Sequence, residues 1–169
     1  YLVVEDRAQK AKLAKVYRRL YRLFNPIVER QARGDEKQLR AIAPGQWQAE
    51  HFEDLPVLVI PCYRRGLKHR PTGHPQIAVA SFYGSVYPAV QNLLLACRAV
   101  GLGASLQTLP IWWVPAVRKI LGLPRNVTPV CIIPIGWAKG RYGPTTRRPI
   151  GEVVHLDRYG NRPFLDPPG

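Results

Sequence analysis

A short basic loop near the carboxyl end carries the side chains best suited to chemistry. Lys139, Arg141, Arg147 and Arg148 lie in the run KGRYGPTTRR, which also contains a proline. Because a guanidinium presents its N–H donors in a fixed fork, arginines on a constrained loop suit a phosphate group. A solvated basic loop is an equally common structure. The loop alone therefore indicates either a phosphate site or an exposed turn.

Common catalytic patterns are absent from the sequence. It contains no Walker loop, no GxGxxG after a strand, no GxSxG and no HExxH. The 11 acidic residues are scattered, so no pair of carboxylates is a candidate for acid–base work. We therefore expect no catalytic side chain.

The histidines and cysteines do not form a ligand pattern. His69 and His74 stand in a loop of turn-forming residues with no third ligand nearby, so we expect no metal site. Cys62, Cys97 and Cys131 are widely spaced in apolar contexts. This arrangement predicts three buried, reduced thiols in a cytoplasmic protein.

The charge of the chain is strongly positive. A net charge of +14 favours anionic partners: nucleic acid, a phosphate-bearing cofactor or an anionic surface. Seven cations lie between Arg7 and Arg22 without an acid among them. They form either a solvated helix face or a surface for nucleic acid or membrane. No aromatic residues interleave them and no nucleic-acid motif is present, and no apolar run reaches the roughly 18 residues of a membrane span.

The hydrophobic pattern predicts one domain, residues 1–169, of mixed helices and strands. A helix break is predicted at Asn25–Pro26, a short helix is possible over 27–32, and Lys37–His51 has little pattern. The predicted elements are a strand over Tyr1–Val4, an amphipathic helix over Arg7–Phe24, buried strands over Leu55–Tyr63 and Thr128–Gly136, a short helix over Val114–Leu121 that ends at Gly122, and a last ordered element over Gly151–Leu156.

The stretch Ser81–Leu109 contains an unusually apolar predicted helix. Between Val86 and Val100 only three residues are strongly polar, so the helix should be covered on most sides. Ser85 is the predicted N-cap and Pro88 a first-turn proline. Gly101 is expected to end the helix, followed by a short strand. Either the rest of the domain or a second subunit must cover this helix.

The chain resembles the FMN-dependent nitroreductase family. The resemblance is carried by SVYPAVQNLLLACRAVGLGASLQT and RKILGLPRNVTPVCIIPIGWAKGRYGPTTRRPIGEVVHLDRYG, which hold element order and spacing, and it extends from Tyr1 to about Gly160. It implies an α+β fold with a mainly antiparallel central sheet flanked by helices, and a homodimer with the apolar helix at its interface. It also implies hydride transfer from NADH or NADPH through FMN to a small-molecule acceptor such as a nitroaromatic or quinone, with the protein binding and tuning the flavin.

The same resemblance implies a set of cofactor-binding residues. Arg147 and Arg148 match the basic residues that contact the FMN phosphate, with Lys139 and Arg141 as further candidates on that loop. Thr108 and Leu109 match the turn whose backbone N–H groups face the flavin edge. The helix entry, through Ser85, Tyr87 and Pro88, is expected to touch the ring or the partner subunit, or to serve packing alone.

The sequence departs from the family at its beginning. An N-terminal helix with an Arg-Ser-x-Arg phosphate motif and an Asn-x-Gln-Pro-Trp-like segment would precede Tyr1, so we expect this chain to be N-terminally truncated. The alternative function is a non-enzymatic basic protein on the same fold that has lost flavin and binds nucleic acid or another anion.

Overall fold

The computed structural model describes residues 1–64, 75–140, 143 and 147–164. The chain divides into two units, Tyr1–Ala138 and Lys139–Gly169, and each is described by itself. The prediction of a single domain over 1–169 therefore stays a prediction. Within the described residues no helix has the length and apolar character needed to cross a membrane.

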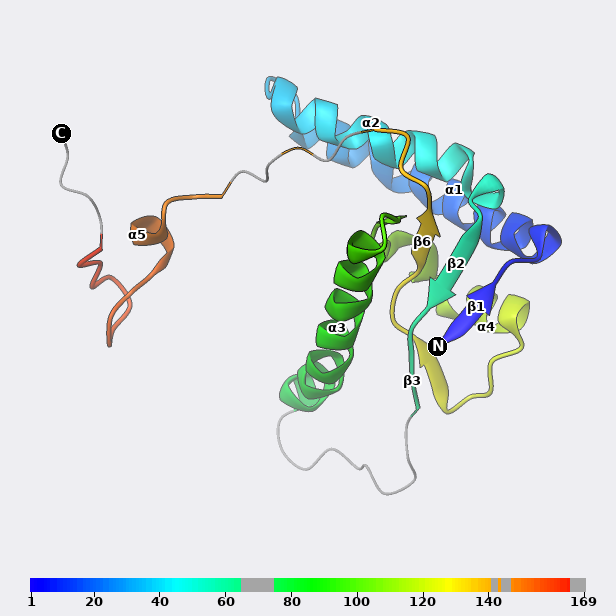
Figure 1. Cartoon of the computed structure of the whole chain (residues 1–169). Helices are drawn as coiled ribbons and strands as arrows, with labels where there is room; N and C mark the ends of the chain where they lie inside the picture. Colours follow the sequence, from blue (N-terminus) through cyan, green and yellow to red (C-terminus); the bar gives the residue numbers. More distant parts are fainter. Residues whose placement is uncertain (65–74, 141–142, 144–146, 165–169) are drawn as a thin grey trace. The chain divides into compact units, whose positions relative to one another are not determined.

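The described residues of the first unit form a sheet, a smaller strand pair and four α-helices (Figure 1). The second unit contains the short helix α5, Ile150–Val153, where the sequence predicted an ordered element over Gly151–Leu156. In chain order the first unit is built from β1 Leu2–Val4, α1 Arg7–Gln31, α2 Glu36–Glu50, the 3₁₀ turn η1 Phe52–Asp54, β2 Val57–Ile60, β3 Cys62–Arg64, α3 Pro75–Ala99, β4 Gly103–Ala104, the 3₁₀ turn η2 Leu109–Ile111, α4 Val114–Leu121, β5 Val127–Pro129 and β6 Ile133–Gly136.

The strands pair antiparallel throughout the described residues, as predicted. The main sheet has the order β1-β2-β6-β4, and β3 pairs with β5. Each predicted long strand is thus split in two, because the register changes between the pairs. The span Val59–Cys62 faces Pro129–Ile133, which is one residue longer. This extra residue is a β-bulge, a feature that bends a strand and redirects its side chains.

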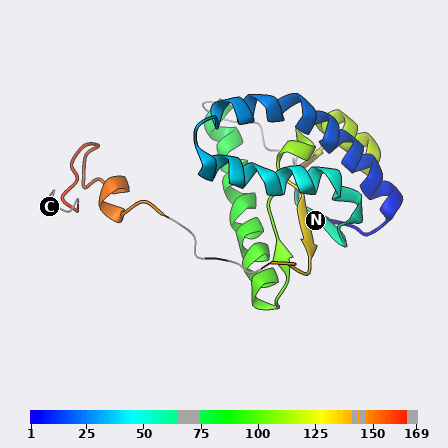
Figure 2. The same cartoon turned by 90° about the horizontal axis from the view of Figure 1, so that it is seen from above.

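The sheet separates two apolar clusters because its side chains alternate between faces. Leu58 and Ile60 pack with α1 and α4, in a cluster that includes Leu13 and Val117. Val59 and Ile133 face the other way and pack against α3. Figures 1 and 2 show α1 and α3 at different sides of the strands. The fold is therefore helices, sheet and helix in three layers.

The first helix, α1, extends beyond its predicted end, and the second, α2, was not predicted. The break predicted at Asn25–Pro26 is wrong, since α1 continues to Gln31. Pro26 has no N–H, so the carbonyl of Arg22, four residues earlier, lacks its helical hydrogen bond. Because Arg22 is exposed, water can replace that bond. The segment predicted to have little pattern forms α2, with Pro44 inside it. Its start is capped by the side chain of Asp35, which accepts from the N–H of Gln38.

The helix α3 also begins earlier than predicted. It starts at Pro75, so Ser85 and Pro88 lie in its interior and the prediction of an N-cap at Ser85 is wrong. The Ser85 hydroxyl instead donates to the carbonyl of Ser81 at 3.2 Å. Its end is as predicted. Gly101 has φ of +80°, and the N–H of Leu102 donates to the carbonyl of Cys97, which closes the helix.

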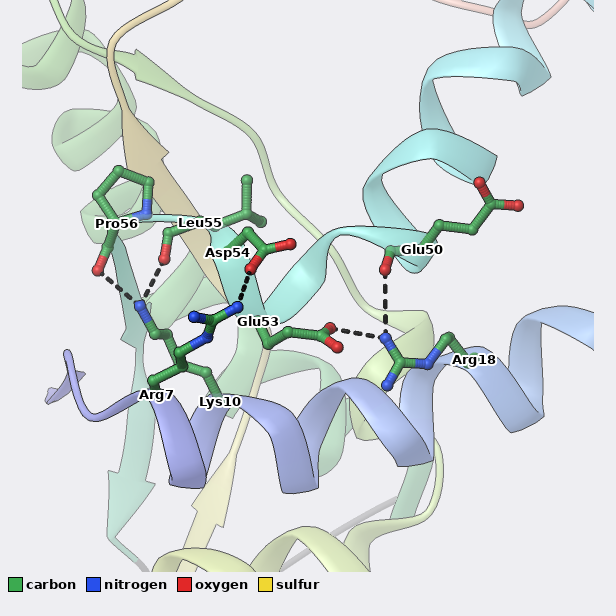
Figure 3. Close-up of polar contacts among 8 residues, drawn as sticks. All are labelled: Arg7, Lys10, Arg18, Glu50, Glu53, Asp54, Leu55 and Pro56. Atoms are coloured by element: carbon green, nitrogen blue, oxygen red, sulfur yellow. Dashed lines mark hydrogen bonds and ion pairs between the residues drawn. The ribbon is translucent and has the colours of Figure 1, made fainter.

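Lys10 is buried, although the sequence placed it on the solvated face of the first helix. Its side chain is 6% exposed, and Nζ donates to the carbonyls of Leu55 at 2.6 Å and Pro56 at 3.0 Å (Figure 3). These carbonyls directly precede β2. The buried ammonium therefore holds the segment that enters β2 through two backbone carbonyls.

Replacing Lys10 by Met is expected to lower the free energy of unfolding by about 1–3 kcal/mol, because the two hydrogen bonds from the ammonium to the carbonyls of Leu55 and Pro56 are lost. Urea unfolding followed by circular dichroism measures the change. Lys12→Met is the matched control, since Lys12 is exposed on the same helix and bonds only Gln9 among the described contacts. Equal stability of the two variants would contradict a structural role for Lys10.

Two further cations of this helix are also used within the fold (Figure 3). Arg7 pairs with Asp54 at 2.8 Å, and Arg18 donates to Glu53 at 2.6 Å and to the carbonyl of Glu50 at 3.2 Å. Burial raises the pKa of Glu53, but the hydrogen bond and charge of Arg18 outweigh it and the pKa is lowered overall. Part of the basic run therefore binds the segment before β2, residues 50–56, to the first helix.

Candidate functional site

A hollow of about 520 Å³ lies where α3, the η2 turn and the bulged strand meet. Cofactor and ligand pockets commonly have about 300–1,000 Å³. Two of the residues that the sequence singled out, Thr108 and Tyr87, line this hollow. Its full lining is Tyr83, Tyr87, Thr108, Ile111, Trp112, Val114, Thr128, Pro129 and Val130.

The bulge explains how Thr108 reaches the hollow. Ile132, within the bulged span, exchanges two backbone hydrogen bonds with Gln107: its N–H donates at 2.8 Å and its carbonyl accepts at 2.9 Å. Gln107 is thereby fixed against the strand that carries Pro129 and Val130. The next residue, Thr108, begins the η2 turn and accepts from the N–H of Ile111 at 3.0 Å. One strand therefore supplies both a wall of the hollow and the anchor of the turn.

Leu109 and the residues of α3 take different places. The side chain of Leu109 packs against the apolar cluster that includes α1, and Leu109 does not line the hollow. Ser85 and Pro88 are exposed on α3 and do not line the hollow. Tyr87 does, together with Tyr83 one turn earlier, and their rings stack with centroids 6.1 Å apart.

The hollow is lined by uncharged side chains. Burial first, and then the neighbouring Cys131 and Tyr83, raise the pKa of Tyr87. Burial, followed by Cys62, raises the pKa of the Cys131 thiol to about 11. With no charged side chain among the described residues of its lining, the site suits a largely apolar group rather than an ion.

A charged residue supports the wall from behind. Arg118 of α4 donates to the carbonyl of Val127 at 2.9 Å and to the Thr128 hydroxyl at 3.0 Å. Thr128 lies in the lining, so the guanidinium fixes one of the few hydroxyls there. The sequence reasoning did not single out Tyr83, Trp112 or Thr128. Tyr83 and Thr128 are distant from Thr108 along the chain, Trp112 is four residues beyond it, and no motif marks any of the three.

The basic loop belongs to the second unit. Lys139, Arg147 and Arg148 are exposed, and Arg141 lies outside the described residues. The structure thus groups Thr108 with Tyr87, and the role predicted for the basic residues stays a prediction.

A second hollow, of about 350 Å³, lies between α1 and α2. It contains none of the predicted site residues, and several of its polar groups bond each other: Asn25 donates to Glu29 and Gln46 donates to Glu50. We therefore take the hollow at Thr108 as the candidate site.

No metal centre is formed by the residues that the structure describes, because they contain no group of three or more His, Cys, Asp or Glu side chains suited to an ion. His69 and His74 lie outside those residues. Cys97 and Cys131 are buried free thiols, as predicted, while Cys62 is half-buried.

Comparison with known proteins gives a family and a fold. The model of the nitroreductase family matches residues 1–137. Among solved structures, an iodotyrosine deiodinase described as bound to FMN and 3-iodo-L-tyrosine is 24% identical, with a TM-score of 0.64, over 95% of this chain and 74% of that one.

Two bacterial structures have the same fold. A nitroreductase-like family protein from Bacillus cereus is 17% identical (TM-score 0.59), over 92% of this chain and 71% of that chain. A BluB-like flavoprotein from Clostridium difficile is 16% identical (TM-score 0.59), over 93% and 78%. At these identities the similarity establishes the fold, which matches the predicted antiparallel α+β architecture.

Proposed function

The chain belongs to the nitroreductase family, and on that premise we propose that it is an FMN-dependent oxidoreductase whose flavin ring binds in the hollow at Thr108. When bound, FMN would supply the redox chemistry, passing a hydride from NADH or NADPH to a nitroaromatic, a quinone or a similar acceptor. The single observation that carries the proposal is the uncharged, aromatic hollow formed at the turn that the sequence matched to the flavin edge.

The residues present fit such a ring. The rings of Tyr83, Tyr87 and Trp112 offer flat apolar surface, and the hydroxyls of the two tyrosines, Thr108 and Thr128 and the indole N–H of Trp112 are the polar groups of the lining. A few placed polar groups in an apolar pocket are typical of cofactor sites. These side chains would exclude water from the ring and orient it.

The turn would tune the flavin. We propose that the backbone N–H groups of Thr108 and Leu109 donate to the polar edge of the ring, where fixed donors stabilise negative charge. For the phosphate we propose Arg147 and Arg148, with Lys139 and Arg141 as further candidates on the same loop.

The exposed face of α3 supports a homodimer. Val86, Val90 and Leu94 pack against the sheet, whereas the apolar side chain of Leu95 is 58% exposed. Ser85 and Pro88 are also exposed there, and we propose that they contact the partner subunit rather than the ring of their own site. A second copy would cover the apolar surface that this helix leaves open.

The alternative, a basic protein without flavin, has less support. Its supports are the absent N-terminal motif, the net charge of +14 and the cation run of the first helix. Of that run, Arg7, Lys10 and Arg18 are engaged within the fold. A cytoplasmic location, predicted from the cysteines, remains part of the proposal.

The proposal predicts that the purified chain binds added FMN and turns yellow. Under anaerobic conditions NADH or NADPH should bleach the visible absorption, and a quinone or nitroaromatic should restore it. Heat-denatured chain at the same flavin concentration is the control for reduction in free solution. A chain that retains no yellow flavin after the excess FMN is removed by gel filtration would contradict the proposed function.

A further inference from the structure

Gln107, the residue before Thr108, is held through its side chain as well as its backbone. Its backbone pairs with Ile132, as described above. Its side-chain oxygen accepts from the hydroxyl of Tyr17 at 3.5 Å, and its side-chain nitrogen donates to the hydroxyl of Ser105 at 3.5 Å. The side-chain amide of Gln107 therefore connects α1, through Tyr17, to Ser105 at the start of the segment that leads to the turn.

The helix α2 joins the same network. The side-chain nitrogen of Gln48 donates to the hydroxyl of Ser105 at 3.1 Å. Two helices, α1 through Tyr17 and α2 through Gln48, thus reach the segment that leads to Thr108. Neither residue lines the hollow.

Tyr17 is built to remain a donor in this network. It is 2% exposed, and its ring packs edge to face against Phe52 with centroids 5.0 Å apart. Burial first, and then Tyr21, raise the pKa of Tyr17 to about 12. The hydroxyl keeps its proton near neutral pH and can donate to Gln107 Oε1, while Nε2 of the same amide donates to Ser105.

We propose that Gln107 is a positioning residue for the Thr108 turn, held directly by Tyr17 and, through the hydroxyl of Ser105, by Gln48. The inference rests on the proposed function, in which Thr108 and Leu109 meet the flavin edge. Donors that stabilise charge act best when their position is set before the reaction, and small misplacements are costly. The network sets that position from behind the site. Through Tyr17 and Gln48, the positions of α1 and α2 thereby affect where the turn places its backbone N–H groups at the flavin.

Hydrogen–deuterium exchange of the full chain without flavin tests the network directly. Gln48→Leu and Tyr17→Phe should each accelerate exchange in the peptide covering residues 103–112 about fivefold, the effect of one lost hydrogen bond. Gln46→Leu, on the same helix but bonded to Glu50, and Tyr159→Phe, 91% exposed, are the matched controls. Exchange equal to that of the controls, with unchanged melting temperature, would overturn the proposal.

The visible spectrum of bound FMN tests the link to the flavin. Gln48→Leu and Tyr17→Phe should shift the absorption band and the flavin reduction potential, whereas the controls should not. Faster exchange with an unchanged spectrum and potential would overturn the positioning role, since the turn would then move without effect at the ring. If the unaltered chain binds no FMN, the proposed function fails, while the exchange result still decides whether the network holds the turn.

Discussion

Replacing Arg147 and Arg148 together by alanine is expected to weaken FMN binding at least about 100-fold, because two charge-assisted hydrogen bonds to the phosphate contribute about 1.5–3 kcal/mol each. Riboflavin lacks the phosphate, so its affinity should change by less than about threefold. Fluorescence titration with both flavins measures the two constants. Both arginines are exposed, so the double variant should fold normally.

A matched control is available on the same unit. Arg158 is also exposed and lies outside the predicted phosphate loop, so Arg158→Ala should leave both affinities unchanged. Equal losses for FMN and riboflavin in the double variant would assign the effect to unfolding or to ring binding. A loss in Arg158→Ala as large as in the double variant would show that general positive charge, rather than these two arginines, attracts the flavin.

Leu95→Lys is expected to dissociate the proposed homodimer, raising its dissociation constant at least about 100-fold. Leu95 is exposed on the face of α3 opposite Val90, which is 1% exposed. In a twofold symmetric interface each substitution places two uncompensated charges in an apolar contact, and an unpaired buried charge costs several kcal/mol. Sedimentation velocity over a concentration series measures the constant.

Leu23→Lys is the control for this experiment. Leu23 is 64% exposed on α1, close to the 58% of Leu95, but belongs to another helix. The proposal requires that Leu23→Lys sediment like the unaltered chain. A monomeric unaltered chain, or a dimer that survives Leu95→Lys, would remove α3 as the interface.

Much of the architecture follows from local pattern. The strand at the start, the amphipathic first helix and the glycine that ends α3 were predicted because alternation, helical spacing and positive φ are local properties. The family resemblance predicted the antiparallel sheet correctly. Helix limits failed at Pro26, Pro44 and Pro88. Local rules treat proline as a break, whereas a packed helix tolerates one lost bond that water can replace.

The site divides in the same way. Thr108 and Tyr87 were selected from the sequence, since they stand in recognisable runs. Tyr83, Trp112 and Thr128 entered only through the hollow, which forms where distant segments meet. The bulge that anchors Gln107 depends on register between two strands, and register depends on pairing across the sheet.

Side-chain partners show most clearly what only the tertiary structure decided. The sequence by itself determined that the chain is basic, mostly apolar in α3, and a member of the nitroreductase family. It could not tell that Lys10 turns inward to the carbonyls of Leu55 and Pro56, or that Tyr17 reaches Gln107. A local pattern records which residues share a helix face. The partner that a buried donor finds depends on which distant segment the fold brings against that face.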